Sequence, residues 1–201
     1  MTATDRQTTL AGEARYEGFG LHTGERCRVV FLPAPPNTGI VFVRTDMPGR
    51  PEVKVAAENA TYDADQGRRT ILRSGNAEVH TVEHLLAAVR CMGIDNLRIE
   101  IDAREPGEPG DGSAGPYVEL FRSTGIQEQD APRLYFEIPH EVRLTHGRAE
   151  LIALPHPSLR VSFTIEYENP VIDTRHVAFD VVPEVFARDF VEQLICSLIS
   201  L

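Results

Sequence analysis

Short strand-like runs dominate the first half of this 201-residue chain. They are rich in Val, Ile and Phe, alternate in part between apolar and polar residues, and are separated by turn residues. Six such runs cover residues 8–21, 26–34, 39–46, 52–62, 69–75 and 96–103. Two helical patterns, at 81–92 and 116–123, are set among these runs, and the second is closed by Gly125. This order of elements predicts an α+β domain built on a sheet.

The second half of the chain again places strands before a helix. Four further strand-like runs cover 134–146, 149–156, 159–168 and 176–182. A helical pattern follows from Pro183, and it ends apolar and without a cap. The polar segment 126–133 is the best linker candidate, so we expect a first domain at 1–128 and a partial second domain at 129–201. The element order favours a duplicated domain whose second copy is incomplete.

Composition excludes several classes of protein. The chain is 42% hydrophobic and 25% charged, which is typical of a folded globular domain, and its formal charge of -10 disfavours nucleic acid as a partner. The three cysteines form no C-x-x-C pair, which favours a reducing compartment. The sequence shows no export signal and no apolar run long enough to span a bilayer. We therefore expect a cytoplasmic monomer with no integral membrane segment.

The helical pattern at 81–92 carries the clearest chemical signal. Its apolar residues recur on one side of the helix, at Val82, Leu85, Leu86, Val89 and Met92. At about 100° per residue, His80 and His84 lie together on the opposite side, with Glu83 beside them. Two imidazoles and a carboxylate on one face are typical of zinc hydrolases, in which the carboxylate removes a proton from a water.

Taken alone, this pattern leaves two alternatives open. H-x-x-E-H matches the inverted zincin proteases, in which both histidines would bind zinc and Glu83 would be the base. However, a five-residue motif often arises by chance, and this small, sheet-rich chain differs from the large helical domain that carries it in those proteases. The protease is therefore the weaker reading, and under it His80 would be as essential as His84.

Longer motifs identify a better match. The stretches at 18–24 (GFGLHTG), 33–46, 81–96, 108–118 and 163–173 together closely resemble the UDP-3-O-acyl-N-acetylglucosamine deacetylase family, the zinc hydrolases of lipid A biosynthesis. The resemblance implies duplicated two-layer α/β sandwich domains, like domain 2 of ribosomal protein S5, with the active site between them. It also implies a UDP-linked acylated amino sugar as substrate.

The resemblance assigns roles to particular residues. By position, His84 corresponds to the family's first zinc ligand and Glu83 to the base that activates the attacking water. His80 corresponds to a position that is not a ligand, so we expect it at the start of the helix, outside the metal shell.

Four more positions are implied at the substrate. Leu21 and His22 lie in the glycine-rich stretch that approaches substrate in the family. Arg69 and Ile71 belong to the run that borders the site, and Arg69 is the candidate for a diphosphate contact.

The sequence departs from the family in its second half. The family completes its zinc site with an H-K-x-x-D helix, and no such motif is present here. His176 and Asp180 have the right separation, but their run reads as a strand, where four residues span about 13 Å, too far to share one zinc ion. Two hypotheses follow: a deacetylase homologue whose missing ligands come from elsewhere, or an inactive remnant that acts as a binding module. In either case we expect this chain to bind Zn²⁺ weakly or not at all.

Overall fold

The computed structural model describes residues 6–61, 69–110, 112–166 and 174–182. Its elements in the first part of the chain are β1 (Arg6–Leu10), β2 (Ala14–Phe19), β3 (Arg26–Pro33), β4 (Ile40–Arg44), β5 (Glu52–Lys54), the 3-10 helix η1 (Ala57–Asn59), β6 (Ala60–Thr61), β7 (Ile71–Ser74), β8 (Ala77–His80), α1 (Glu83–Cys91), β9 (Leu97–Ile101), α2 (Gly115–Thr124) and β10 (Ile126–Pro132). The later elements are β11 (Val142–His146), β12 (Ala149–Ala153), β13 (Arg160–Ile165) and β14 (Arg175–Asp180).

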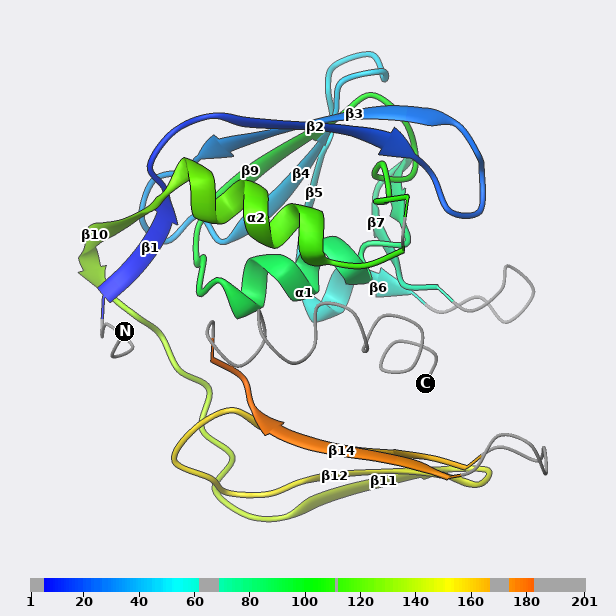
Figure 1. Cartoon of the computed structure of the whole chain (residues 1–201), viewed down its shortest axis with the longest axis vertical. Helices are drawn as coiled ribbons and strands as arrows, with labels where there is room; N and C mark the ends of the chain where they lie inside the picture. Colours follow the sequence, from blue (N-terminus) through cyan, green and yellow to red (C-terminus); the bar gives the residue numbers. More distant parts are fainter. Residues whose placement is uncertain (1–5, 62–68, 111, 167–173, 183–201) are drawn as a thin grey trace.

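A five-stranded sheet forms the frame, with helices α1 and α2 packed side by side on one of its faces (Figure 1). The strand order is β2-β3-β9-β4-β5, and only the β4–β9 pair within this sheet is parallel. Strands alternate between buried and outward residues, as in β9, because one face meets the helices and the other meets water. The architecture is α+β, as the sequence predicts.

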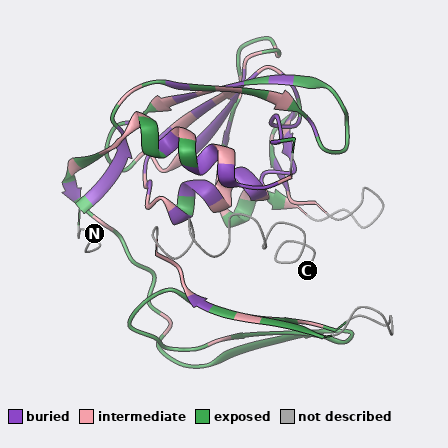
Figure 2. Cartoon of the chain, in the orientation of Figure 1, coloured by how far each residue is buried: buried purple, intermediate pink, exposed green. Residues whose placement is uncertain are grey.

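The core lies between the sheet and the helices (Figure 2). Phe31 of β3 contacts Tyr117 and Phe121 of α2 edge-on, at centroid distances of 5.9 and 4.9 Å. Edge-to-face contact is the favoured geometry for aromatic rings, and it adds to the burial of large apolar surfaces. This cluster holds α2 against the sheet, and α1 packs against α2.

Helix α1 is buried more widely than the sequence predicts. Val82, Leu85 and Val89 are buried as expected, but Leu86 and Met92 of the predicted stripe are only half-buried. Residues on the opposite side, including His84 and Cys91, are buried as well. The prediction of a single buried face was therefore incomplete, because α2 also packs against α1.

The segment predicted as a linker, 126–133, is instead strand β10, which pairs with β1. One of its polar side chains, Gln129, joins a hydrogen-bond network around the buried Asn96. The buried Asn96 side chain accepts from Gly39 N at 2.8 Å and donates to Gln7 Oε1 and Gln129 Oε1 at 2.8 and 2.7 Å. The linker prediction was wrong because this segment is a strand paired with β1, although Gln127, Glu128 and Asp130 are exposed, as polar linker residues would be.

Other predicted runs are divided in the structure. The run 8–21 contains two strands, β1 and β2, which belong to different sheets. The run 52–62 contains β5, η1 and β6, and only its first part joins the five-stranded sheet. Strand signals thus located the sheet-forming segments, while pairing partners decided where each strand ends.

The second half forms two antiparallel hairpins, β11–β12 and β13–β14, on the helix side of the first-half sheet (Figure 1). These strands are largely exposed, but Phe179 of β14 joins the buried cluster of the first half. His176 and Asp180 both lie in β14, which confirms the strand prediction and excludes a helical ligand pair. The helix predicted from Pro183 lies outside the described residues, and the duplication and the boundary at 128/129 stay predictions.

Replacing Asn96 tests the polar network behind β1 and β10. Asn96→Ala removes one hydrogen bond each from Gln7 and Gln129 and leaves the amide of Gly39 without its acceptor, so we expect a loss of roughly 2–4 kcal/mol in unfolding free energy. Urea denaturation measures this loss. Asn59→Ala, which removes a hydrogen bond to a backbone carbonyl near the surface, is the control and should cost less than about 1 kcal/mol. Equal losses in the two variants would contradict a structural role for the network.

Candidate functional site

The candidate site is built at the start of α1, where the chain turns sharply out of β8. Thr81 has a φ of 51°, a left-handed conformation that is uncommon for a residue other than glycine. Its N–H donates to Thr70 O at 2.9 Å, which connects the turn to the residue just before β7. The helix then begins at Glu83, two residues later than predicted, so Glu83 and His84 both occupy its first turn.

A buried histidine–carboxylate pair lies at the centre of the site. His84 Nδ1 is 2.7 Å from Glu108 Oε2, and the side chains are only 8% and 4% exposed. The carboxylate accepts this bond, which orients the imidazole ring. A metal-ligating histidine is typically held in this way by a carboxylate on its other nitrogen. Sequence reasoning missed Glu108, because it lies in a Pro- and Gly-rich stretch that reads as a turn.

Backbone contacts fix Glu108 in turn. Its N–H donates to Phe19 O at 2.9 Å, and the two residues form an isolated bridge between β2 and this segment. A Cβ atom on Gly18 would lie 2.5 Å from Glu108 O, so glycine is required for this approach. The other carboxylate oxygen of Glu108, Oε1, is buried and has no hydrogen-bond partner among the described residues. A buried polar atom without a hydrogen-bond partner lowers the stability of the fold unless a further group binds it.

Glu83 has the properties expected of a base. Its Oε2 accepts from Thr70 N at 3.2 Å, a contact that orients the carboxylate. Burial raises the pKa of Glu83 above its ordinary value, against smaller opposing effects of hydrogen bonds and the nearby His84. A carboxylate with a raised pKa is a stronger base than an exposed one.

His80 does not start the helix, contrary to the prediction. It is the last residue of β8, is 2% exposed, and its Nε2 lies 2.9 Å from Glu78 Oε2 in the same strand. Burial lowers its pKa, and the charge of Arg69 adds to this effect, against the opposing bond to Glu78. His80 therefore has a carboxylate partner of its own, apart from the His84–Glu108 pair.

The four predicted substrate residues fall in two places. Leu21 and His22 are exposed in the loop between β2 and β3, directly after the Phe19 contact with Glu108. Arg69 is half-buried next to Thr70, whose N–H donates to Glu83. Leu21 and His22 thus follow a residue that bonds to Glu108, and Arg69 adjoins a residue that bonds to Glu83.

Ile71 has a different environment. It is 1% exposed and lies opposite His80 in the β7–β8 pairing. Its side chain belongs to the core in this structure, and its role in substrate binding stays a prediction.

The described residues do not complete a zinc site. Within residues 6–61, 69–110, 112–166 and 174–182 there is no group of three or more His, Cys, Asp and Glu side chains that could hold a metal ion. A zinc ion in proteins normally has at least three protein ligands. His84 therefore fits the role of one ligand, and the described part of the chain does not fit tight zinc binding by itself.

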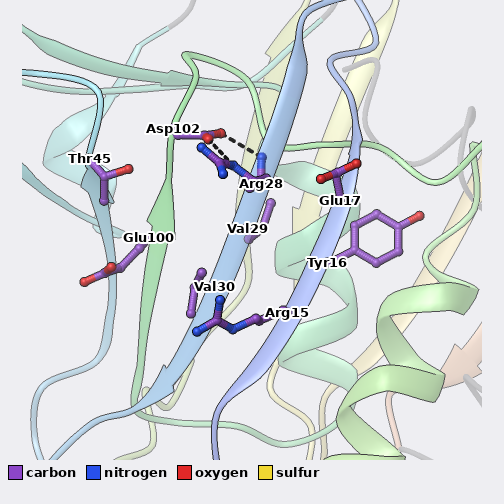
Figure 3. Close-up of a pocket in the computed structure, with 9 residues that line it drawn as sticks. All are labelled: Arg15, Tyr16, Glu17, Arg28, Val29, Val30, Thr45, Glu100 and Asp102. Carbon is purple, nitrogen blue, oxygen red and sulfur yellow. Dashed lines mark hydrogen bonds and ion pairs between the residues drawn. The ribbon is translucent and has the colours of Figure 1, made fainter.

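A pocket of about 460 Å³ lies on the five-stranded sheet, away from α1 (Figure 3). The Arg28 side chain donates to Asp102 at 2.7 Å there, and none of the predicted site residues lines the pocket. Paired charges at the surface are satisfied and solvated. The pocket is therefore not the site that α1 indicates.

The chain was compared with known proteins. The family model for LpxC, UDP-3-O-acyl N-acetylglycosamine deacetylase, matches residues 7–193. The chain is similar to the UDP-3-O-acyl-N-acetylglucosamine deacetylase of Bdellovibrio bacteriovorus (37% identity over 91% of this chain and 59% of the relative) and to that of Chromohalobacter salexigens (45%, over 83% and 54%). It is also similar to the bifunctional enzyme LpxC/FabZ of Chlorobaculum tepidum (38%, over 92% and 39%). The chain thus spans about two fifths to three fifths of the length of these relatives.

Neither α-helix of the described residues has the length and apolar character that a membrane crossing requires.

Glu83→Gln should stabilise the fold in a pH-dependent way. Burial raises the pKa of Glu83 in the folded state above its ordinary value of 4.5. The folded state is therefore fully stable with respect to this group below pH 4.5, and it loses stability as the pH rises through the folded-state pKa. Glutamine removes this loss. Thermal unfolding in a metal chelator should show a midpoint raised by roughly 2–5 °C at neutral pH, with the gain vanishing below pH 4.5. The exposed Glu58→Gln should show no such gain, and a lowered midpoint for Glu83→Gln would contradict the assignment.

Proposed function

The chain belongs to the LpxC family of UDP-3-O-acyl N-acetylglycosamine deacetylases, and on this premise we propose that it provides the base and one zinc ligand of that deacetylase reaction. The reaction removes the N-acetyl group from UDP-3-O-acyl-N-acetylglucosamine in lipid A biosynthesis. The observation that carries the proposal is the first turn of α1, where Glu83 precedes His84 and His84 Nδ1 is held by Glu108 at 2.7 Å.

Glu83 is the proposed general base. It accepts a proton from the water that attacks the acetyl carbonyl carbon and returns this proton to the amide nitrogen as the carbon–nitrogen bond breaks. The second proton of the water passes from the acetic acid so formed to the amine, which leaves acetate and a protonated amine. The raised pKa of Glu83, caused mainly by burial, favours this proton transfer, and the bond from Thr70 N keeps the carboxylate oriented.

His84 is the proposed metal ligand. Because Glu108 occupies the Nδ1 side of the ring, Nε2 is the nitrogen that would bind zinc. When bound, zinc acts as a Lewis acid that polarises the carbonyl and lowers the pKa of a coordinated water. The remaining ligands are not among the described residues, so no further step is assigned to the metal.

The proposed substrate contacts lie on either side of these residues. Leu21 and His22 would contact the sugar nucleotide from the loop after β2, and Arg69 would contact its diphosphate, for which a guanidinium is well suited. Ile71 would shape the base of the site from β7. The UDP-linked acylated amino sugar is the proposed partner, and the exposure of Leu21 and His22 supports their part in binding it.

The proposal extends to the organisation of the chain. Residues 1–128 and 129–201 would form two related α+β units, and the hairpins β11–β12 and β13–β14 support a second sheet-bearing unit. A cytoplasmic monomer is proposed, in keeping with Cys27 and Cys91, which are buried as free thiols.

A second candidate function is binding of the sugar nucleotide without hydrolysis. It is favoured by one observation: the described residues contain no group of three potential metal ligands. The two candidates share the loop after β2, and both predict little zinc in the isolated chain. They differ when the remaining ligands are supplied, because only the first then predicts bound zinc and turnover.

The purified 201-residue chain should contain well under one zinc ion per molecule and should bind UDP-3-O-acyl-N-acetylglucosamine without hydrolysing it, because three protein ligands are normally needed for tight zinc binding. Metal content is measured by mass spectrometry, binding by calorimetry, and turnover by release of acetate. His84→Ala should remove the residual zinc, while the exposed His156→Ala serves as control. Stoichiometric zinc that is lost on His84→Ala would contradict this expectation, and absence of binding would contradict the proposed function.

A chimera tests the chemistry itself. The matched region of the Bdellovibrio bacteriovorus relative is replaced by the corresponding residues of this chain, and deacetylation and zinc are measured. We expect turnover with bound zinc. Glu83→Gln should lower kcat by about 10²–10⁴-fold with the zinc retained, whereas His84→Ala should lose the zinc. Full activity of the Glu83→Gln chimera would overturn the assignment of the base.

A further inference from the structure

The loop between β2 and β3 is held from within by one buried carboxylate. Glu105 is 0% exposed, and its Oε2 accepts from His22 N at 3.0 Å, Thr23 N at 2.9 Å and Thr23 Oγ1 at 3.0 Å. Two consecutive backbone amides and a hydroxyl thus converge on one oxygen. Hydrogen bonds to an ionised carboxylate are stronger than those between neutral groups.

The loop is shaped to fit this carboxylate. A Cβ atom on Gly20 would lie 2.2 Å from Thr23 Oγ1 and 2.5 Å from Glu105 Oε2, so only glycine allows the approach. Gly20 N donates to Glu25 O, and Gly24 N donates to Gly20 O, both at 2.8 Å. The backbone of the loop is therefore closed on itself and turned toward Glu105.

Unlike the Thr23 side chain, which bonds to Glu105, the side chains of Leu21 and His22 are exposed. Leu21 is 56% exposed and His22 is exposed, although the N–H of His22 is bonded to a fully buried group. An exposed leucine on a loop whose backbone is fixed loses little further conformational freedom when it binds a ligand. This arrangement is typical of a pre-organised binding loop.

The segment that carries Glu105 also holds the side chain of His84. Glu105 lies three residues before Glu108, which binds His84 and pairs with Phe19 at the start of the loop. A Cβ atom on Gly107 would lie 2.6 Å from Gly18 N, so the two backbones touch between these points. The position of the loop and the position of His84 are therefore set by one stretch of four residues.

We propose that Glu105 is a positioning residue, which fixes the loop 20–24 so that Leu21 and His22 meet the sugar nucleotide beside His84. The identity of the ligand rests on the proposed function; the positioning rests on the contacts of Glu105. Glu105 itself touches no reacting atom and acts through the loop.

The electrostatics of Glu105 support this role. Burial alone would raise its pKa, but the interactions with Thr81, Thr23 and His22 together outweigh burial and lower it. The carboxylate is therefore ionised at neutral pH and accepts its hydrogen bonds as a full anion.

The test is Glu105→Gln in the 201-residue chain. This substitution keeps the shape of the side chain and removes its charge. We expect amide hydrogen exchange at His22 and Thr23 to become about tenfold faster or more, and affinity for UDP-3-O-acyl-N-acetylglucosamine to fall by a similar factor. Exchange is measured residue by residue by NMR, and affinity by calorimetry. Unchanged exchange at both amides would overturn the proposal, and so would faster exchange with unchanged affinity.

Asp95→Asn is the matched control. The Asp95 carboxylate also accepts from a backbone amide, Thr8 N at 2.8 Å, but it belongs to the β1 side of the molecule. This variant should lose thermal stability without any change in exchange at the loop amides or in ligand affinity. If Glu105 had a purely structural role, the Glu105→Gln variant would behave in the same way as this control.

Two further outcomes are also decisive. If Glu105→Gln does not fold, Thr23→Val removes one donor and leaves the carboxylate, and it should produce a smaller effect in the same direction; no effect would overturn the proposal. If the unsubstituted chain binds no sugar nucleotide, the proposed function fails, while the exchange data still decide whether Glu105 positions the loop.

Discussion

The contact of residues 105–108 with β2, α1 and α2 is the constraint on which the rest of the site depends. Glu105 holds the loop after β2, Glu108 holds His84 of α1, and Tyr117 of α2 donates its hydroxyl to a carbonyl of the same segment. Three elements that are distant in sequence therefore share one short stretch of backbone. Because that stretch is buried and rich in Gly and Pro, its path cannot shift without disturbing all three contacts.

Polar groups are buried here at some cost to stability. The first turn of α1 places Glu83 and His84 in a region that a helix of this kind would otherwise fill with apolar residues, and burial disfavours the ionised form of Glu83. The surrounding core offsets this cost: α1 is held by Leu85 and Val89, which are buried in the core cluster. Such local destabilisation supported by a rigid frame is common at active sites.

The two halves of the described chain differ in how much they bury. The first half encloses a core between the sheet and two helices, whereas the hairpins β11–β12 and β13–β14 are largely exposed (Figure 2). Phe179 is the buried residue that connects β14 to the core of the first half. The family match extends across both halves, while the chain spans about half the length of the relatives it matches.

The sequence by itself determined the α+β class, the segments that form the sheet, the helix bearing Glu83 and His84, and the strand that keeps His176 and Asp180 from forming a helical ligand pair. These features depend on local periodicity or on long motifs, which can be read along the chain. Only the tertiary structure decided that Glu105 and Glu108 are buried partners, that 126–133 is a strand, and that His80 pairs with its own strand neighbour. The physical reason is distance along the chain. Glu108 and Glu105 lie in a turn-like stretch that reads as solvated, and folding brings their partners to them from 24 and 83 residues away, His84 to Glu108 and His22 to Glu105.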